Sequence, residues 1–431
     1  MHIIPAPKEW IELEQTVIRN FRWNFAVNTL DISFYSLAQN LVSQTTIMPL
    51  MVSQLTSSKV AIGLIPAIYS LGFLLPQLLM ANYTEGLRRK KPILMLLGGT
   101  GERMPYFLIG LLLVWLAKPA PEVTLVLFFV LLGISAATNG LITPAWYDLI
   151  GKVIPVRWRG IWSGTGSSLG ALMGVAGAAL AGWALVTFPF PANYAVCFLL
   201  AGVAMAVSWT GLALNREPES EVVKEPAHLS SYFKQLPSVL RRDSNYLRYL
   251  ASLSVANIGG MAAGFITVYG VEHFKLGGAE VAAWTGLLVG SQAVMNLAWG
   301  LLADRHGHKI VLCAASIGMA LAVLVCWASA SAAWMWLVFV LLGVSISADG
   351  VSNMNIILEF CAEEDRPTYI GLTNTLLAPT KALAPILGGW MAASLGYAPM
   401  FAFAVAVAIL AAVLLAIWVR EPRVAAPAGS A

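Results

Sequence analysis

Charged residues are scarce in this sequence, at 11% of its 431 positions. Soluble domains carry about 25% charged residues, whereas 58% of this chain is hydrophobic. This balance excludes an ordinary soluble globule. The composition predicts an all-α polytopic membrane protein.

Several chemical signatures are also missing. The four cysteines (Cys197, Cys313, Cys326 and Cys361) are far apart and form no CxxC or Cys/His spacing, so neither a metal site nor a disulfide is predicted. The phosphate-binding motif GxxxxGK[ST] is absent, which argues against a protein that is driven directly by ATP hydrolysis. No nucleophile–base constellation is visible either. We therefore expect no catalytic residues, no cofactor and no nucleic-acid partner.

Long apolar stretches make up most of the sequence. A helix needs about 20 mainly apolar residues to cross about 30 Å of hydrocarbon. Twelve stretches satisfy this requirement, and we predict twelve transmembrane helices near 22–49, 60–81, 92–117, 122–145, 160–187, 192–214, 246–271, 279–302, 310–328, 333–358, 368–395 and 398–419.

The positive charges give these spans an orientation. Lys and Arg stay preferentially on the cytoplasmic side of a membrane. With twelve spans, the run Arg88–Lys91 and most other basic residues fall on the side of the termini, whereas the other side receives only Lys59, Lys118 and Lys275. This asymmetry predicts an integral protein of a cytoplasmic (inner) membrane with both termini in the cytoplasm.

The chain divides into two similar parts. A polar segment at 215–245 separates a six-helix half at 1–214 from a second at 246–431, as a cytoplasmic linker would. "LGISAATNG" (132–140) resembles "LGVSISADG" (342–350) in the corresponding spans. Two parallel six-helix repeats are typical of transporters that bind their substrate between the halves. We expect a monomer.

A short charged stretch between two apolar runs identifies the family that the chain resembles. "GLLADRHGHK" (300–309) resembles the loop signature G-x-L-A-D-R-x-G-[RH]-[RK] of the major facilitator superfamily (MFS). The resemblance implies the MFS fold, in which this loop helps to close the cytoplasmic side. It makes Asp304 the acid of a gate, with Arg157, Arg159 or Arg366 as candidate partners.

The rest of that loop has steric and electrostatic roles. Gly300 and Gly307 permit a close helix approach and a tight turn. Arg305 and Lys309 either take part in the gate or serve only as positive anchors on the cytoplasmic side.

Ionisable residues inside spans are costly, so each is a candidate for a site. In the first span, Asn24, Asn28, Asp31 and Tyr35 share one helix face at spacings of four, three and four. We expect this polar stripe to face the passage. A hydrogen-bond network that only packs helices is the alternative.

The second half has its own polar face, with Asp349 and Asn353 one helical turn apart, and Asn139 occupies the position equivalent to Asp349 in the first half. Lys381 needs a counter-charge within the membrane, and Asp349 is the natural candidate. Such a pair would bind an anionic substrate or form a structural bridge.

Glu102 and Arg103 lie near the middle of the third span. Adjacent helical residues point about 100° apart, so we do not expect them to pair directly. We expect one of them to reach Asp31. The group is either a buried structural network or a proton path in which Glu102 or Asp31 binds the proton.

These features predict a secondary active transporter that moves a small organic solute through the lipid bilayer by alternating access, coupled to protons. One alternative is a transporter of an amphipathic or lipid-like compound, such as a drug efflux pump. Another is a non-transporting assembly or sensor protein on a transporter fold.

Overall fold

A computed structural model of the protein describes residues 8–85, 87–219, 243–361 and 366–422. Within these ranges all regular secondary structure is helical, which confirms the predicted all-α fold. Nine helices in the described residues are long and apolar enough to cross a membrane. Lipid offers the backbone no hydrogen-bond partners, so an apolar chain of this kind satisfies its N–H and C=O groups within helices.

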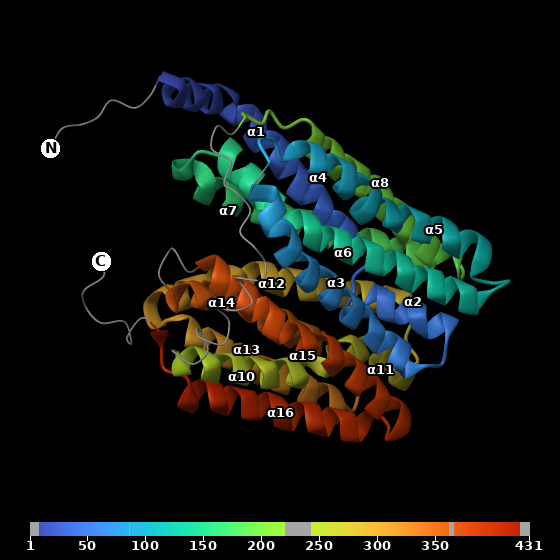
Figure 1. Ribbon diagram of the computed structural model, residues 1–431. Helices are drawn as coiled ribbons and strands as arrows, with labels where there is room; N and C mark the ends of the chain where they lie inside the picture. The colour runs from blue at the N-terminus through green and yellow to red at the C-terminus, as the bar shows by residue number, and fades with distance from the viewer. Residues whose placement is uncertain (1–7, 86, 220–242, 362–365, 423–431) are drawn as a thin grey trace.

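The helices of the first half pack mainly on one another, and the same is true of the second half (Figure 1). The first half contains α1 (Lys8–Leu41), α2 (Ile47–Leu55), α3 (Lys59–Glu85), α4 (Lys91–Leu97), the π-helix η1 (Gly98–Arg103), α5 (Met104–Leu116), α6 (Pro121–Val153), α7 (Val156–Thr187) and α8 (Ala192–Ala213). The second half contains α10 (Ser244–Gly259), the 3₁₀ turn η2 (Gly260–Ala262), α11 (Ala263–Phe274), α12 (Gly278–His306), α13 (His308–Ala328), α14 (Trp334–Glu359), α15 (Arg366–Ser394) and α16 (Tyr397–Trp418).

Three predicted spans are interrupted. The continuous helix expected over 22–49 is wrong, because α1 ends at Leu41 and α2 begins at Ile47. Hydroxyl side chains compete with helical hydrogen bonds, and in this break Ser43 Oγ accepts from the backbone N–H of Thr45 at 3.4 Å. The stretches at 246–271 and 92–117 are interrupted by η2 and η1, respectively.

The linker predicted at 215–245 lies mostly at 220–242, outside the described residues. At its start, Asn215 hydrogen-bonds to Asn28 of α1, and Glu217 accepts from the backbone at the beginning of α4. These described residues therefore contact the first-half helices. Past the linker, α10 begins after Asp243, whose side chain accepts from the backbone N–H of Tyr246.

The halves meet mainly along two helix pairs, α3 with α15 and α7 with α12. Gly389 of α15 makes the first contact possible, because a Cβ at this position would lie 2.7 Å from the carbonyl oxygen of Lys59. A Cβ on Gly63 would likewise overlap the carbonyl oxygen of Pro385. The two backbones approach closely because neither glycine carries a side chain.

The halves are joined more firmly at one end than at the other. At the end that carries α2 and α11, which we call the opposite side, Thr267 Oγ1 donates to Thr45 O at 2.9 Å. There too, Thr285 Oγ1 donates to Thr46 Oγ1 at 2.7 Å. One apolar core on this side contains residues of both halves. At the end where α1 begins and α16 ends, which we call the terminal side, each half has a core of its own (Figure 1).

Candidate functional site

A hollow of about 330 Å³ lies within the first half, between α1, α3, η1, α6 and α8. Its wall is largely aromatic and apolar, but three side chains that carry charge also line it: one aspartate, one glutamate and one arginine. The lining residues are Asp31, Ile32, Tyr35, Tyr69, Phe73, Glu102, Arg103, Asn139, Ile142, Thr143, Trp146, Tyr147 and Leu212.

These three charged residues form one buried cluster, which we call the charge triad: Asp31, Glu102 and Arg103. Their exposed fractions are 3%, 3% and 6%, respectively. Arg103 Nη2 lies 3.2 Å from Asp31 Oδ1, and Nη1 contacts the carboxylate of Glu102. Ser208 Oγ of α8 donates to Asp31 Oδ1 at 2.6 Å. One guanidinium therefore bridges two carboxylates, and the ionised triad carries one net negative charge.

The expectation that Glu102 and Arg103 would not pair directly is wrong. These residues end the π-helix η1, a wider turn with i→i+5 hydrogen bonds that is frequent at functional sites. The long arginine side chain folds back along this turn, and its Nη1 also donates to Gly98 O at 3.3 Å. The expectation that one of the two would reach Asp31 is confirmed, and Arg103 is that residue.

Polar side chains around the triad hold the cavity wall in place. Asn139 Nδ2 donates to the Tyr35 hydroxyl at 2.6 Å, which joins α6 to α1. Trp146 Nε1 donates to Asp31 Oδ2 at 3.3 Å. The guanidinium carbon of Arg103 lies 5.7 Å from the centre of the Tyr35 ring, within the range of a cation–π contact.

The polar stripe of α1 does not face the hollow along its whole length. Asp31 and Tyr35 line the hollow. Asn28, in contrast, is completely buried and exchanges hydrogen bonds with Asn215 at 2.6 and 3.0 Å. The expectation that Asn28 faces the passage is therefore wrong, because its amide is used to pack α1 against the end of α8.

Ser208 and Trp146 contact the triad but were not among the predicted site residues. Only a weak sequence signal could have indicated them, namely a hydroxyl group and an indole within otherwise apolar spans. Their contacts with Asp31 join three helices that are distant in sequence.

A stronger signal in the sequence is the repeated tripeptide Arg-Glu-Pro at 216–218 and 420–422. In the first half, Glu217 accepts from the backbone N–H groups of Lys90 and Lys91 at 2.7 and 2.9 Å. In the second half, Glu421 accepts from the N–H of Lys309 at 3.3 Å. Each glutamate follows the last helix of its half and meets the N-terminus of the half's third spanning segment, where the helix dipole favours a negative charge.

A second repeated contact supports this arrangement. Asn24 Oδ1 accepts from the backbone N–H of Arg216 at 2.9 Å, and Asn24 Nδ2 donates to the Arg216 carbonyl at 3.2 Å. Asn245 makes the same two contacts with Arg420, at 2.8 and 2.9 Å. The two halves thus share a clamp between the first helix and the segment after the last helix.

Of the three polar residues proposed for the second half, two are in contact and the third is not paired with them. Asp349 is exposed and accepts from Asn353 Nδ2 at 3.2 Å. Lys381 is half-buried on α15, and among the described residues it forms no ion pair with Asp349. The expected charge pair is therefore not formed in this conformation, in which Asp349 is bound by Asn353 instead.

Two of the three arginines predicted for the gate are engaged elsewhere or stand apart from its acid in this conformation. Asp304, near the end of α12, is exposed, and neither Arg157 nor Arg159 forms an ion pair with it. Arg159 instead donates to the carbonyl oxygens of Gly151 and Ile154. The side chain of the third candidate, Arg366, lies outside the described side chains.

The glycines and basic residues of the loop have different surroundings. Gly307 adopts φ +88°, so the predicted tight turn is confirmed. Among the described residues, nothing lies within 4 Å of the position that a Cβ on Gly300 would take, so the close helix approach expected there is wrong for this conformation. Arg305 is exposed. Lys309 Nζ donates to the carbonyl oxygens of Ala416 and Val419, both at 2.9 Å, and thereby joins α13 to α16.

Two helical halves, the first of which holds a buried charge cluster at a hollow, are typical of a polytopic membrane transporter. The family profile described as Major Facilitator Superfamily matches residues 32–291 and 249–431. The chain therefore belongs to the major facilitator superfamily, whose members are membrane transporters, as the loop at 300–309 indicated.

Two curated relatives match part of the chain. The multidrug resistance protein MdtG of Dickeya zeae (strain Ech586) is 26% identical over 184 residues, which cover 41% of this chain and 44% of the relative. The multi-drug resistance efflux pump PmrA of Streptococcus pneumoniae serotype 4 is 26% identical over 156 residues, covering 35% and 39%, respectively. Each match thus spans less than half of the relative's length.

Solved structures show the same fold over nearly the whole chain. A mutant of the nucleoside transporter NupG superposes with a TM-score of 0.72 at 10% identity, covering 92% of this chain and 100% of that one. A D-xylose-proton symporter gives 0.69 at 13% identity, covering 94% and 99%. At these identities, the likeness concerns the fold alone.

Proposed function

We propose that this protein is a secondary transporter that moves a small organic solute by alternating access, coupled to protons. The observation that carries the proposal is the charge triad, which is buried and lines a hollow of about 330 Å³. Buried charges within a membrane are costly, and they are retained mainly where they bind a substrate or carry a proton.

The triad provides a simple means of coupling. Its two carboxylates share one guanidinium, which stays protonated under all physiological conditions. Binding of one proton to Asp31 or Glu102 makes the triad neutral, and its release restores one negative charge. The two states differ in their attraction for a charged solute, so proton binding and solute binding influence each other.

The contacts between the halves support alternating access. This conformation is joined on the opposite side by a shared core and by the Thr285–Thr46 hydrogen bond. The predicted gate residues Asp304, Arg157 and Arg159 are exposed on the terminal side. We propose that they meet when the halves rock to close that side, and that Gly300, Arg305, Gly307, Lys309 and Arg366 belong to the same gate.

We propose that the terminal side faces the cytoplasm of a bacterial inner membrane, because positive residues are concentrated there. In this orientation the conformation closes the extracytoplasmic side. Asp349, Asn353 and Lys381 are proposed contacts from the second half, on the basis of their positions in α14 and α15, and they would approach the solute as the halves move.

A second candidate function is export of amphipathic organic cations. The hollow contains the aromatic rings of Tyr35, Tyr69, Phe73, Trp146 and Tyr147, and the ionised triad has one net negative charge. Aromatic faces attract cations. The names of the MdtG and PmrA relatives, which refer to multidrug resistance and efflux, agree with this candidate.

The test is transport by the purified protein in proteoliposomes with an imposed pH gradient, using panels of sugars, nucleosides, organic anions and lipophilic cations. We expect Asp31→Asn and Glu102→Gln to remove the dependence of transport on the gradient. Glu122→Gln, which changes an exposed carboxylate at the start of α6, is the matched control. Transport that keeps its full pH dependence in both triad variants would exclude these residues as proton carriers.

The panel separates the two candidates. Concentrative flux of a water-soluble solute supports the first proposal. Flux of lipophilic cations that is lost on Tyr35→Ala supports the second. Absence of pH-gradient-driven flux for every class would contradict proton coupling.

A further inference from the structure

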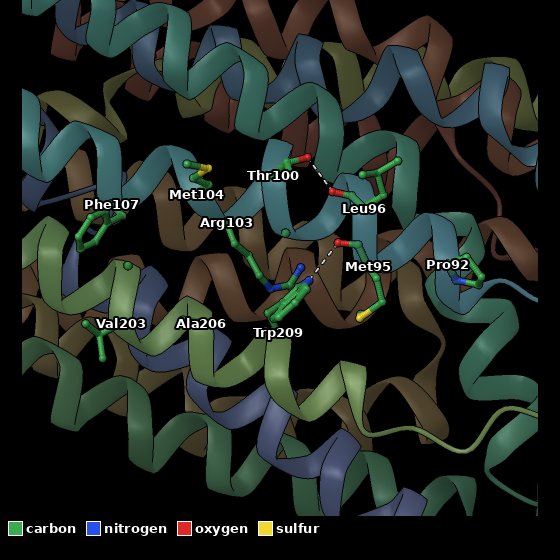
Figure 2. A pocket seen from close by; sticks show the side chains of 12 residues that line it. Pro92, Met95, Leu96, Thr100, Arg103, Met104, Phe107, Val203, Ala206 and Trp209 are labelled. Carbon is green, nitrogen blue, oxygen red and sulfur yellow. Dashed lines mark hydrogen bonds between the residues drawn. The ribbon is translucent and has the colours of Figure 1, made fainter.

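A second and larger hollow lies on the outer surface of the first half. This lateral groove runs between the α4–η1–α5 segment and α8 and has a volume of about 720 Å³ (Figure 2). It is lined by Pro92, Met95, Leu96, Gly99, Thr100, Arg103, Met104, Phe107, Gly202, Val203, Ala206 and Trp209. Most of these side chains are apolar, and Leu96 and Val203 are more than half exposed.

The polar groups of the groove are already satisfied within the protein. Trp209 Nε1 donates to Met95 O at 3.0 Å across the groove, and Thr100 Oγ1 donates to Leu96 O at 2.6 Å (Figure 2). Arg103, at the floor, is held by the two carboxylates of the charge triad. The remaining surface is apolar and suits a hydrocarbon chain.

A polar hollow of about 350 Å³ adjoins one end of the groove and shares Pro92 and Met95 with it. The other lining residues are Arg89, Lys91, Asn215, Arg216 and Glu217. Three of them are cationic and one is acidic.

The acidic residue of this polar hollow is already engaged. The Glu217 carboxylate accepts from the backbone N–H groups of Lys90 and Lys91 and from Lys152 Nζ. The basic side chains of Arg89 and Arg216 are exposed. Arg89 pairs with Glu219, but among the described residues Arg216 Nη1 contacts only the neutral amide of Asn20, so the hollow keeps a positive charge toward its surroundings.

The two hollows together have the dimensions and polarity of a phospholipid. Pro92 and Phe107 mark the ends of the groove, and the α-helical rise would place them up to about 22 Å apart along the α4–η1–α5 segment, which the wider π-helix η1 shortens. One leaflet of the hydrocarbon core is about 15 Å thick. The groove is therefore long enough for a whole acyl chain, and the basic hollow lies at the end where a head group would be.

We propose that this surface is a binding site for one anionic phospholipid. Its phosphate lies in the basic hollow among Arg89, Lys91 and Arg216, and one acyl chain lies in the lateral groove. The sign of the charge distinguishes this occupant from a transported cation, because the hollow at the end of the groove is cationic. Basic pockets beside transmembrane helices bind anionic lipid head groups in this way.

The test measures retention of dioleoyl-phosphatidylglycerol by the full-length, delipidated protein in detergent, using native mass spectrometry and a lipid titration. Dioleoyl-phosphatidylcholine and inorganic phosphate are the comparison ligands. We expect phosphatidylglycerol to bind more tightly than either. Arg89→Gln should weaken its binding about fivefold, the effect of losing one positive charge near a lipid surface.

Two matched variants test the head-group contact. Arg88→Gln removes an exposed charge from the same basic run, but Arg88 does not line the hollow, so binding should not change. Glu219→Gln should strengthen binding, because Glu219 pairs with Arg89 at 2.7 Å and competes with the phosphate.

A second pair of variants tests the chain contact. Val203→Trp fills the groove and should lower phosphatidylglycerol retention, whereas Val126→Trp, at an exposed position on α6, should not. Equal retention of both lipids with no effect of Arg89→Gln would overturn the proposal. Solute transport blocked by Val203→Trp with lipid retention intact would also overturn it, since the groove would then be a path for solute.

Discussion

Glu217 allows a quantitative test of how the first half is held together. Its carboxylate is 2% exposed. It accepts from the N–H groups of Lys90 and Lys91 at 2.7 and 2.9 Å and from Lys152 Nζ at 3.3 Å. Glu217→Gln keeps the shape of the side chain but replaces one acceptor oxygen with an NH₂ group, which cannot accept. One backbone N–H then loses its partner, and the negative charge at the helix N-terminus is lost.

The magnitude follows from these two losses. An unsatisfied buried donor costs about 1–3 kcal/mol, and loss of the charge at the helix N-terminus costs about 0.3–1 kcal/mol. We therefore expect Glu217→Gln to destabilise the first half by about 1–4 kcal/mol. For a unit of about 200 residues, 1 kcal/mol lowers Tm by roughly 2–4 °C, so a decrease of several degrees is expected.

The assay is thermal unfolding of the purified full-length protein in detergent, with Glu219→Gln as the control. Glu219 lies two residues further along, and its side chain is 57% exposed in an ion pair with Arg89. Exposed pairs contribute about 0–1 kcal/mol, so this control should melt close to the wild type. A Glu217→Gln protein that melts with the wild type, or two variants with equal decreases, would refute the reasoning.

Three further predictions follow from single contacts. Gly307→Ala should lower Tm, because a residue with a side chain at φ +88° costs about 1–2 kcal/mol. Gly300→Ala should leave Tm unchanged, because no described atom lies within 4 Å of the added Cβ. Equal Tm values for the two variants would contradict this prediction. Ser208→Ala removes the 2.6 Å hydrogen bond to Asp31 and should cost about 1.5–3 kcal/mol, measured as a lower Tm together with a shifted pH profile of transport. Gly63→Ala should lower the free energy of unfolding by about 1–3 kcal/mol, because the added methyl group overpacks α3 against α15. The measurements are Tm and the labelling of a cysteine placed on the opposite side. If neither changes, the close contact at Gly63 is dispensable.

The fold was largely predictable because hydropathy is a local property. Apolar stretches of sufficient length form helices wherever lipid surrounds them, since their backbone groups have no other partners. The interruptions within the predicted transmembrane helices were harder to predict from the sequence. The break between Leu41 and Ile47 and the π-helix at Gly98–Arg103 change how backbone hydrogen bonds are made without changing the mean hydropathy.

The site was predictable only in part. The cost of burying charge in a membrane singled out Asp31, Glu102 and Arg103, and the structure brings all three together. The same reasoning suggested a pair between Lys381 and Asp349, which is not formed in this conformation. Burial identifies the residues that need a partner, but not the partner that each one meets.

The sequence by itself determined that this is a helical membrane protein, and its loop at 300–309 indicated the family. Only the tertiary structure decided that Arg103 bridges Asp31 and Glu102, that Asn28 packs against Asn215, and that Lys309 joins α13 to α16. The physical reason is that hydropathy and helix formation depend on neighbours along the chain. The pairing of polar groups depends instead on how far each helix is rotated about its axis, which packing between distant segments sets.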